Sequence, residues 1–273
     1  LQQTNYQLCI INYQLIPIFT SMKIKKHIPN FITSLNLVCG VFAILFFIKF
    51  TEPIDQGLRN LINPTYSFLL NGIMLILTAT VLDFLDGFLA RLLKVQSEIG
   101  AQLDSLADMI TFGVAPGFLF YAMIHEFYPE EDLLKYFFIL IPIFSALRLA
   151  KFNVDTEQTD YFKGIATPAN ALFWVGTFFI IKNYHPHFSI YILTTLVIIL
   201  SLLMTSNLRM FSLKLKNLKL EGDNIYRLIL IVGAVVLTIV FGMFTNILAS
   251  IPFIILLYIL LSLSYHYSTR NTK

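Results

Sequence analysis

The chain has 273 residues, of which 57% are hydrophobic and only 13% are charged, with a formal net charge of +3. Soluble domains average about 45–50% apolar and about 25% charged residues, so a water-soluble globule is excluded, and disorder is excluded because it requires low hydrophobicity and high charge. The apolar runs last about 20 residues, which suits membrane-spanning helices, whereas strands of a membrane barrel need only about 9–11. The composition therefore predicts an all-α, polytopic membrane bundle.

The N-terminal segment, residues 1–27, is expected to lie outside the core. Residues 1–21 carry no charge, whereas a signal peptide would carry a basic region before its apolar stretch. Met22 is followed closely by three lysines and then by the first long apolar run. We therefore expect Met22 to be the natural start.

About eight spans follow. We expect a six-helix membrane domain over residues 28–215 and two additional helices within 216–273. If the N-terminus is cytoplasmic, 15 of the 19 Lys and Arg residues fall on the cytoplasmic side, as the positive-inside rule requires. We therefore expect an integral membrane protein with both chain ends in the cytoplasm. Because we recognise no organelle-targeting segment, we expect the membrane to be a prokaryotic cytoplasmic membrane. The expected spans lie near residues 31–50, 66–90, 104–125, 133–150, 166–182, 188–206, 225–244 and 246–265.

Four carboxylates stand where the second span ends and the third begins. Asp83 and Asp86 are three residues apart, and Asp104 and Asp108 are four apart, so each pair shares one helix face. A short cytoplasmic turn joins the two spans, which places them side by side. Because acids within a bilayer cost about 2.5–3.5 kcal/mol on insertion scales, intramembrane acids indicate function. The spacing predicts that the four acids meet just below the cytoplasmic surface.

Close carboxylates repel one another, so either some are protonated or a cation compensates them. A site made only of oxygen ligands favours Mg²⁺ or Mn²⁺, and Mg²⁺ commonly binds carboxylates together with substrate phosphates. Gly87 and Gly100 let a ligand approach the backbone, and Arg91 offers a donor pair suited to phosphate. Singly, these features are ordinary caps, packing glycines or interface anchors. Together they predict metal-assisted displacement at a phosphate.

The run of eight positions from the first acid to the last resembles the motif of the CDP-alcohol phosphatidyltransferase family at every defined position and spacing. The resemblance implies transfer of a phosphatidyl or similar group from a CDP-linked lipid to an alcohol, with release of CMP. It implies that Asp83, Asp86 and Asp104 are metal ligands. Asp108 would complete the metal cluster and act as the base. The remaining four positions would line the CDP pocket: Gly87, Ala90, Arg91 and Gly100.

Other segments resemble the phosphatidylserine synthase branch of this family. The first span opens with Asn30 and Thr33, which the resemblance places beside the nucleotide of the CDP-lipid. The segments 146–154, 162–169 and 206–212 are also similar to that branch. They imply L-serine as the acceptor, bound through Arg148, Lys151 and Asn153. A cationic pair would complement the serine carboxylate, although the same two cations also suit positive-inside anchoring.

These observations predict an enzyme that uses Mg²⁺ or Mn²⁺ to transfer a phosphatidyl group from CDP-diacylglycerol to L-serine. We expect contact with membrane lipid, no nucleic-acid partner and, from the resemblance, a homodimer. Two alternatives stay open. The acceptor is a different alcohol, such as glycerol phosphate or inositol phosphate, or the protein is a divalent-cation transporter. Transporters often place such acids near the membrane midplane and contain internal repeats, whereas these acids lie at a cytoplasmic end.

Overall fold

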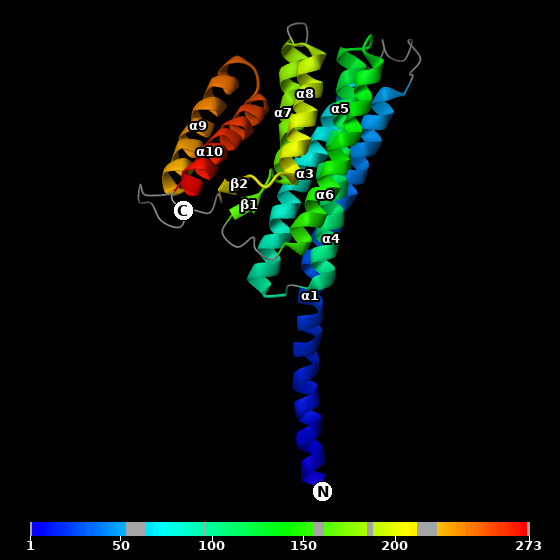
Figure 1. The fold of residues 1–273 in the computed structure, drawn as a ribbon. Coiled ribbons are helices and arrows are strands. Elements are labelled where there is room, and N and C mark those ends of the chain that lie inside the picture. The colour runs from blue at the N-terminus through cyan, green and yellow to red at the C-terminus, as the bar shows by residue number, and fades with distance from the viewer. Residues whose placement is uncertain are drawn as a thin grey trace.

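The computed structural model describes residues 2–52, 64–95, 97–155, 161–184, 188–211 and 223–271. Helices make up most of these residues, and the long helical segments lie side by side in a bundle (Figure 1). The predicted all-α polytopic bundle is confirmed. In chain order the helical segments are α1 (Gln2–Thr51), α3 (Pro64–Leu93), α4 (Glu98–Asp108), the π-helical turn η1 (Met109–Val114), α5 (Ala115–Phe127), the 3-10 helix η2 (Asp132–Ile139), α6 (Leu140–Val154), α7 (Thr167–Tyr184), α8 (Ile190–Thr205), α9 (Asp223–Phe244), the 3-10 helix η4 (Ile247–Ser250) and α10 (Ile251–Asn271).

Six helical segments among the described residues are long and apolar enough to cross a membrane. A seventh apolar helix, α8, is shorter. The boundaries lie within a few residues of most of the expected ones, except that α1 begins at Gln2 and projects beyond one end of the bundle (Figure 1). The six segments are His27–Thr51, Tyr66–Leu93, Glu98–Phe127, Leu133–Val154, Asn224–Phe244 and Ile247–Tyr267.

Helix α7 lies in the protein interior. It contacts α3, α5, α6 and α10, and most of its side chains are buried. Trp174 packs edge-on against Phe120 and Phe173, with ring centroids 5.1 and 5.3 Å apart. Because protein rather than lipid surrounds α7, the helix accommodates buried polar residues such as Thr167 and Asn170. This explains why a helix of 18 residues is less apolar than the six spans.

A π-helical turn, η1, follows the last motif acid and separates α4 from α5. It is held closely on two sides. A Cβ on Gly40 of α1 would lie 2.9 Å from Thr111 Cα, and a Cβ on Gly113 would lie 2.9 Å from Ser145 Cβ of α6. The two glycines thus let α1 and α6 approach η1 more closely than any larger residue would allow.

The structure also contains a two-stranded antiparallel sheet that the all-α prediction lacked. Strand β1 (Tyr161–Lys163) pairs with β2 (Arg209–Phe211), with Lys163 opposite Arg209. Three residues are too few for an alternating pattern to be recognised in a sequence. The Tyr258 hydroxyl of α10 donates to the Phe211 carbonyl oxygen at 3.0 Å. The sheet therefore joins the segments after α6 and α8 to the C-terminal helices.

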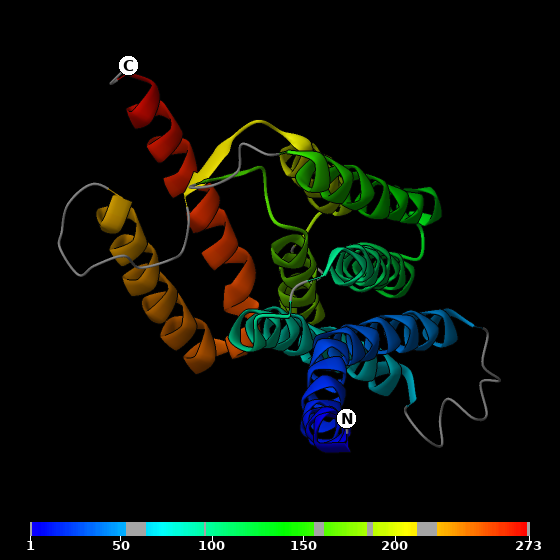
Figure 2. The same ribbon diagram turned by 90° about the horizontal axis from the view of Figure 1, so that it is seen from below.

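The C-terminal pair α9 and α10 stands to one side of the other helices, as both views show (Figures 1 and 2). It meets the bundle through α10, which contacts α7 and β2, and through η4, which contacts α7; Tyr226 of α9 also lies against Phe211 of β2, with ring centroids 6.1 Å apart. The α3 C-terminus, the α4 N-terminus and the C-termini of α6 and α8 lie toward the end of the bundle from which α1 projects (Figure 1). The residues that the sequence analysis singled out therefore gather toward one end.

Candidate active site

Three of the four motif acids meet at this end of the bundle. Asp83 lies in the C-terminal half of α3, and Asp104 and Asp108 lie one turn apart on α4. One carboxylate oxygen from each lies within 4.8 Å of the other two. We call these three residues the acid cluster. The i, i+4 spacing on α4 turns both of its acids toward α3, as the sequence predicted.

The fourth acid, Asp86, lies beside the acid cluster and makes a different contact. Its side chain is almost fully buried, and its Oδ2 accepts a 2.6 Å hydrogen bond from the Thr33 hydroxyl of α1. The sequence analysis expected all four acids in one ligand set. In the structure, oxygens of Asp83, Asp104 and Asp108 form the closest group, and the hydrogen bond from Thr33 ties Asp86 to α1.

The donors of the acid cluster fit a divalent metal ion. Asp104 Oδ1 and Asp108 Oδ1 are buried, and neither has a hydrogen-bond partner within the described part of the chain. Buried carboxylate oxygens without partners are costly unless a cation or a proton compensates them. A set made only of carboxylate oxygens suits a hard cation such as Mg²⁺ or Mn²⁺. The site is therefore a candidate metal centre.

A pocket of about 250 Å³ opens beside the acid cluster, between α1, α3 and the first turn of α4. It brings together residues expected to bind the CDP-lipid. We call it the donor pocket. Its lining residues are Pro29, Asn30, Thr33, Asp86, Gly87, Ala90, Val95, Ser97, Gly100, Ala101 and Asp104.

The two motif glycines have different roles in this pocket. A Cβ on Gly100 would lie 2.9 Å from Asn30 Oδ1 and 3.0 Å from Ser97 Oγ, so Gly100 lets α4 lie close to α1. A Cβ on Gly87 would meet nothing closer than Arg91 Nη1 at 3.8 Å. Gly87 therefore leaves open space in the pocket. Arg91 itself is exposed one turn further along α3 and does not line the donor pocket as described.

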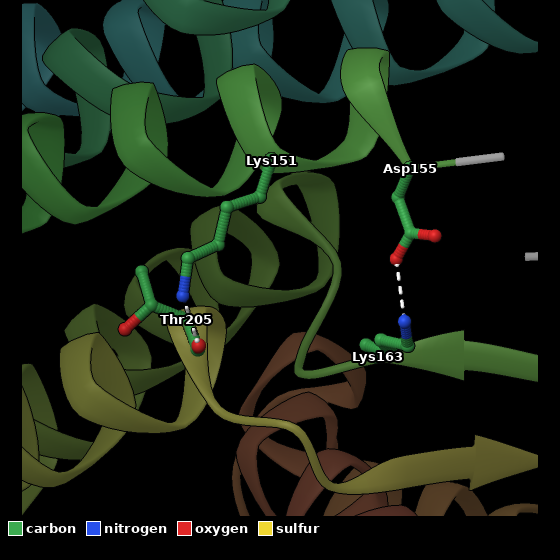
Figure 3. A network of polar contacts seen from close by, with 4 residues as sticks. All are labelled: Lys151, Asp155, Lys163 and Thr205. Atoms are coloured by element: carbon green, nitrogen blue, oxygen red, sulfur yellow. Dashed lines mark hydrogen bonds and ion pairs between the residues drawn. The ribbon is translucent and has the colours of Figure 1, made fainter. Parts of the chain in front are cut away.

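A second pocket, of about 330 Å³, is lined by three cations and one acid, and we call it the basic pocket. Lys151 Nζ donates to the Thr205 carbonyl oxygen at 2.9 Å. Lys163 Nζ forms a 2.7 Å ion pair with Asp155 Oδ2 (Figure 3). The other lining residues are Arg148, Phe152, Val154, Met204, Ser206 and Asn207.

Arg148 lies in the basic pocket, on a helix that packs beside the acid cluster. It lines the pocket, and its helix α6 packs against η1, which directly follows Asp108. Its Nη1 donates to the Thr167 hydroxyl at 3.4 Å, and its guanidinium carbon lies 5.4 Å from the centre of the Phe152 ring. These contacts orient the guanidinium in the pocket.

Asn153, the third residue expected at the acceptor site, lies elsewhere. Its Nδ2 donates to Ser105 Oγ of α4 at 3.0 Å, and it is not among the residues that line the basic pocket. Asn153 points away because it follows Lys151 by only two residues on α6, which places it on another side of the helix.

Several pocket residues were not proposed from the sequence. Asp155 stands four residues after Lys151, a spacing that puts both side chains on one face and could have indicated their proximity. Ser97 accepts a 3.1 Å hydrogen bond from the Gly100 N–H and caps α4. A Ser directly before Glu98 is a recognisable helix-start pattern. The pairing of Lys163 with Asp155 depends on the sheet, and no local sequence pattern indicates it.

Comparison with known proteins identifies the family. The CDP-alcohol phosphatidyltransferase profile matches residues 26–240. The chain belongs to this family of membrane enzymes, which confirms the resemblance seen in the motif.

Three relatives are named CDP-diacylglycerol–serine O-phosphatidyltransferase. The Methanocaldococcus jannaschii protein is 36% identical over 182 residues, covering 67% of this chain and 72% of that protein. The Helicobacter pylori protein is 30% identical over 185 residues, covering 66% and 70%. The Bacillus subtilis protein is 34% identical over 143 residues, covering 52% and 70%.

Proposed function

We propose that this protein transfers the phosphatidyl group of CDP-diacylglycerol to the hydroxyl of L-serine, forming phosphatidylserine and releasing CMP. The names of the similar proteins support this acceptor. The observation that carries the proposal is the position of Arg148, which lines the basic pocket from α6, the helix that packs against η1 directly after Asp108 of the acid cluster. An acceptor held in the basic pocket would thus have its hydroxyl close to the reacting phosphate.

The donor pocket binds the CDP portion of the lipid in this proposal. Its lining between α1, α3 and α4 includes two glycines that permit close approach to the backbone. The N-terminus of α4, capped by Ser97, points its positive end toward this space and favours the negative diphosphate. The acyl chains remain in the bilayer beside the bundle, since the spans expose large apolar side chains.

Asp83, Asp104 and Asp108 would hold the divalent ion, with Asp86 beside them at the donor pocket. A bound Mg²⁺ or Mn²⁺ supplies charge neutralisation for the diphosphate and for the departing CMP. Asp108 receives the proton of the serine hydroxyl as its oxygen attacks the lipid-side phosphorus. The attack breaks the bond between this phosphorus and the CMP oxygen.

The acceptor binds through its carboxylate to Arg148 and Lys151. Lys151 is anchored by the Thr205 carbonyl and Arg148 by Thr167, so both cations are oriented before the acceptor arrives. Such orientation lowers the entropy lost on binding. Positioning and charge compensation supply most of the catalysis in phosphoryl transfer, which is what this arrangement offers.

We further propose that this end of the bundle faces the cytoplasm, with both chain ends on that side, because 15 of 19 Lys and Arg residues then fall there. Residues 28–215 would form the catalytic domain and 216–273 the two additional helices. The prokaryotic cytoplasmic membrane and the homodimer stay predictions. Cysteine accessibility in sealed vesicles would test the orientation, and mass measurement in detergent would test the dimer.

The decisive experiment is an acceptor assay with the purified protein. CDP-diacylglycerol and Mn²⁺ are supplied with serine, glycerol phosphate or inositol phosphate, and both CMP and the lipid product are measured. Of the three acceptors, only serine should give rapid CMP release. Preference for a phosphorylated acceptor would overturn the serine assignment. Absence of CMP release with every acceptor, together with Mn²⁺ uptake into vesicles, would favour a transporter.

A further inference from the structure

The basic pocket contains an acid that a simple anion site would not need. Arg148, Lys151 and Lys163 together would suit a phosphorylated acceptor, for which an added carboxylate is unfavourable. Asp155 nevertheless lines the same pocket. A pocket that places cations and one acid around a common space matches a ligand that carries both charges.

Asp155 lies at one side of the basic pocket, next to Lys163. Asp155 follows the last turn of α6, where its backbone N–H donates to the Lys151 carbonyl oxygen at 3.1 Å. Lys151 and Asp155 reach toward the same space from α6, and Lys163 approaches from β1 (Figure 3). The Asp155 side chain keeps 18% of its surface exposed, so a ligand in the pocket can contact it.

The 2.7 Å ion pair with Lys163 engages Oδ2 and orients the Asp155 carboxylate. A carboxylate can accept from several donors at once. Lys163 comes from β1, which pairs with β2 after α8. The small sheet therefore helps to fix the position of an acid that ends α6.

We propose that Asp155 binds the ammonium group of an amino-acid acceptor while Arg148 and Lys151 bind its carboxylate. This inference rests on the proposed function and adds the residue that selects the acceptor class. Asp155 attracts an acceptor that bears an amine and repels a phosphate dianion, so one side chain contributes both the attractive and the repulsive part of specificity. Lys163 is a positioning residue that acts through Asp155.

The test compares serine with 3-hydroxypropanoate, which is serine without its amine. Asp155→Asn should raise the serine KM about ten- to a hundredfold, as expected for loss of a hydrogen-bonded charge pair. The inhibition constant of 3-hydroxypropanoate against serine should stay within about twofold of the wild-type value. The KM for CDP-diacylglycerol should also stay unchanged. A change in overall folding would move all three values together.

Lys163→Gln is the matched control, because it removes the ion pair and keeps the acid. Its serine KM should rise less than that of Asp155→Asn. Equal rises in the two variants, an equal loss of 3-hydroxypropanoate binding, or no inhibition of the wild type by this compound would overturn the proposal. If Asp155→Asn unfolds, Asp155→Glu keeps the charge and should retain preference for serine over 3-hydroxypropanoate; loss of that preference would contradict the proposal.

The two proposals fail in different ways. If the wild type uses a phosphorylated acceptor and not serine, the proposed function is wrong. If the wild type uses serine and Asp155→Asn keeps the wild-type serine KM, the serine function stands and only the role of Asp155 is wrong.

Discussion

The Thr33 hydroxyl of α1 donates a 2.6 Å hydrogen bond to Asp86 Oδ2 of α3. Both side chains are almost fully buried, and both line the donor pocket. The bond fixes an acid beside the acid cluster and joins two helices at the pocket. Removing this bond should therefore weaken binding of the donor lipid more than binding of the acceptor.

Thr33→Val tests this relationship, because valine has nearly the same shape and lacks the hydroxyl. We expect the KM for CDP-diacylglycerol to rise about tenfold, as for a lost hydrogen bond to a charged group, with little change in the serine KM. Steady-state kinetics with each substrate varied in turn measures the split. Ser34→Ala is the control, since Ser34 is an exposed neighbour whose hydroxyl donates to the Asn30 carbonyl. Equal changes in both KM values would contradict the assignment.

Asp108→Asn should abolish turnover and preserve binding of the CDP-lipid. An amide cannot accept the serine proton, and loss of a general base typically costs about 10²–10⁴ in rate. CMP release measures the rate, and competition with labelled CDP-diacylglycerol measures binding. A fully active Asp108→Asn enzyme would show that another group takes the proton.

Metal binding should be visible in stability without any assay of activity. A ligand that binds only the native state stabilises it by about 2.7 kcal/mol at a hundred times its Kd. Adding Mn²⁺ to chelator-treated protein should therefore raise Tm by roughly 5 °C. Asp104→Asn should reduce the shift, whereas Glu98→Gln, an exposed change on the same helix, should keep it. An unchanged shift in Asp104→Asn would place the ion elsewhere.

Two glycine substitutions should separate stability from binding. Gly40→Ala forces a Cβ to within 2.9 Å of the Thr111 backbone, and such overpacking costs about 1–3 kcal/mol, so Tm in detergent should fall. Gly87→Ala meets no atom closer than 3.8 Å, so Tm should hold while the added methyl group in the donor pocket raises the KM for CDP-diacylglycerol. A fall in Tm for Gly87→Ala together with an unchanged Tm for Gly40→Ala would contradict the roles assigned to the two glycines.

Arg148→Ala should raise the serine KM far more than the KM for CDP-diacylglycerol. The guanidinium lines the basic pocket and not the donor pocket as described. Because the same loss leaves the acceptor hydroxyl less well positioned, kcat should fall as well. Arg148→Lys retains the charge and should recover part of the serine affinity. Similar effects on both substrates would remove Arg148 from the acceptor site.

Much of the fold could be predicted because the bilayer imposes long apolar helices, whose ends are marked by charged residues. The convergence of Asp83 with Asp104 and Asp108 followed from spacing on two adjacent spans. Local periodicity carried this information. The family resemblance added the roles of the residues, which periodicity alone does not give.

The remaining features depend on contacts between distant segments. The bond from Thr33 to Asp86 joins residues 53 positions apart, and the ion pair from Lys163 to Asp155 requires a short sheet. Asn153 was expected at the acceptor site and instead binds Ser105, because a resemblance between segments does not specify which side of α6 faces the pocket. Tertiary packing decided each of these positions.

The π-helical turn η1 affects the orientation of the acids on α4. A π-turn holds one more residue than an α-turn, and each residue of an α-helix advances its direction by about 100°. The π-turn therefore rotates α5 about the helix axis relative to α4. As a result, the acids of α4 and the aromatic side chains of α5 can face different neighbours although the two helices are continuous. We expect that deletion of a single residue within Met109–Val114 would rotate the carboxylates of α4 out of the acid cluster while every span remained in the membrane.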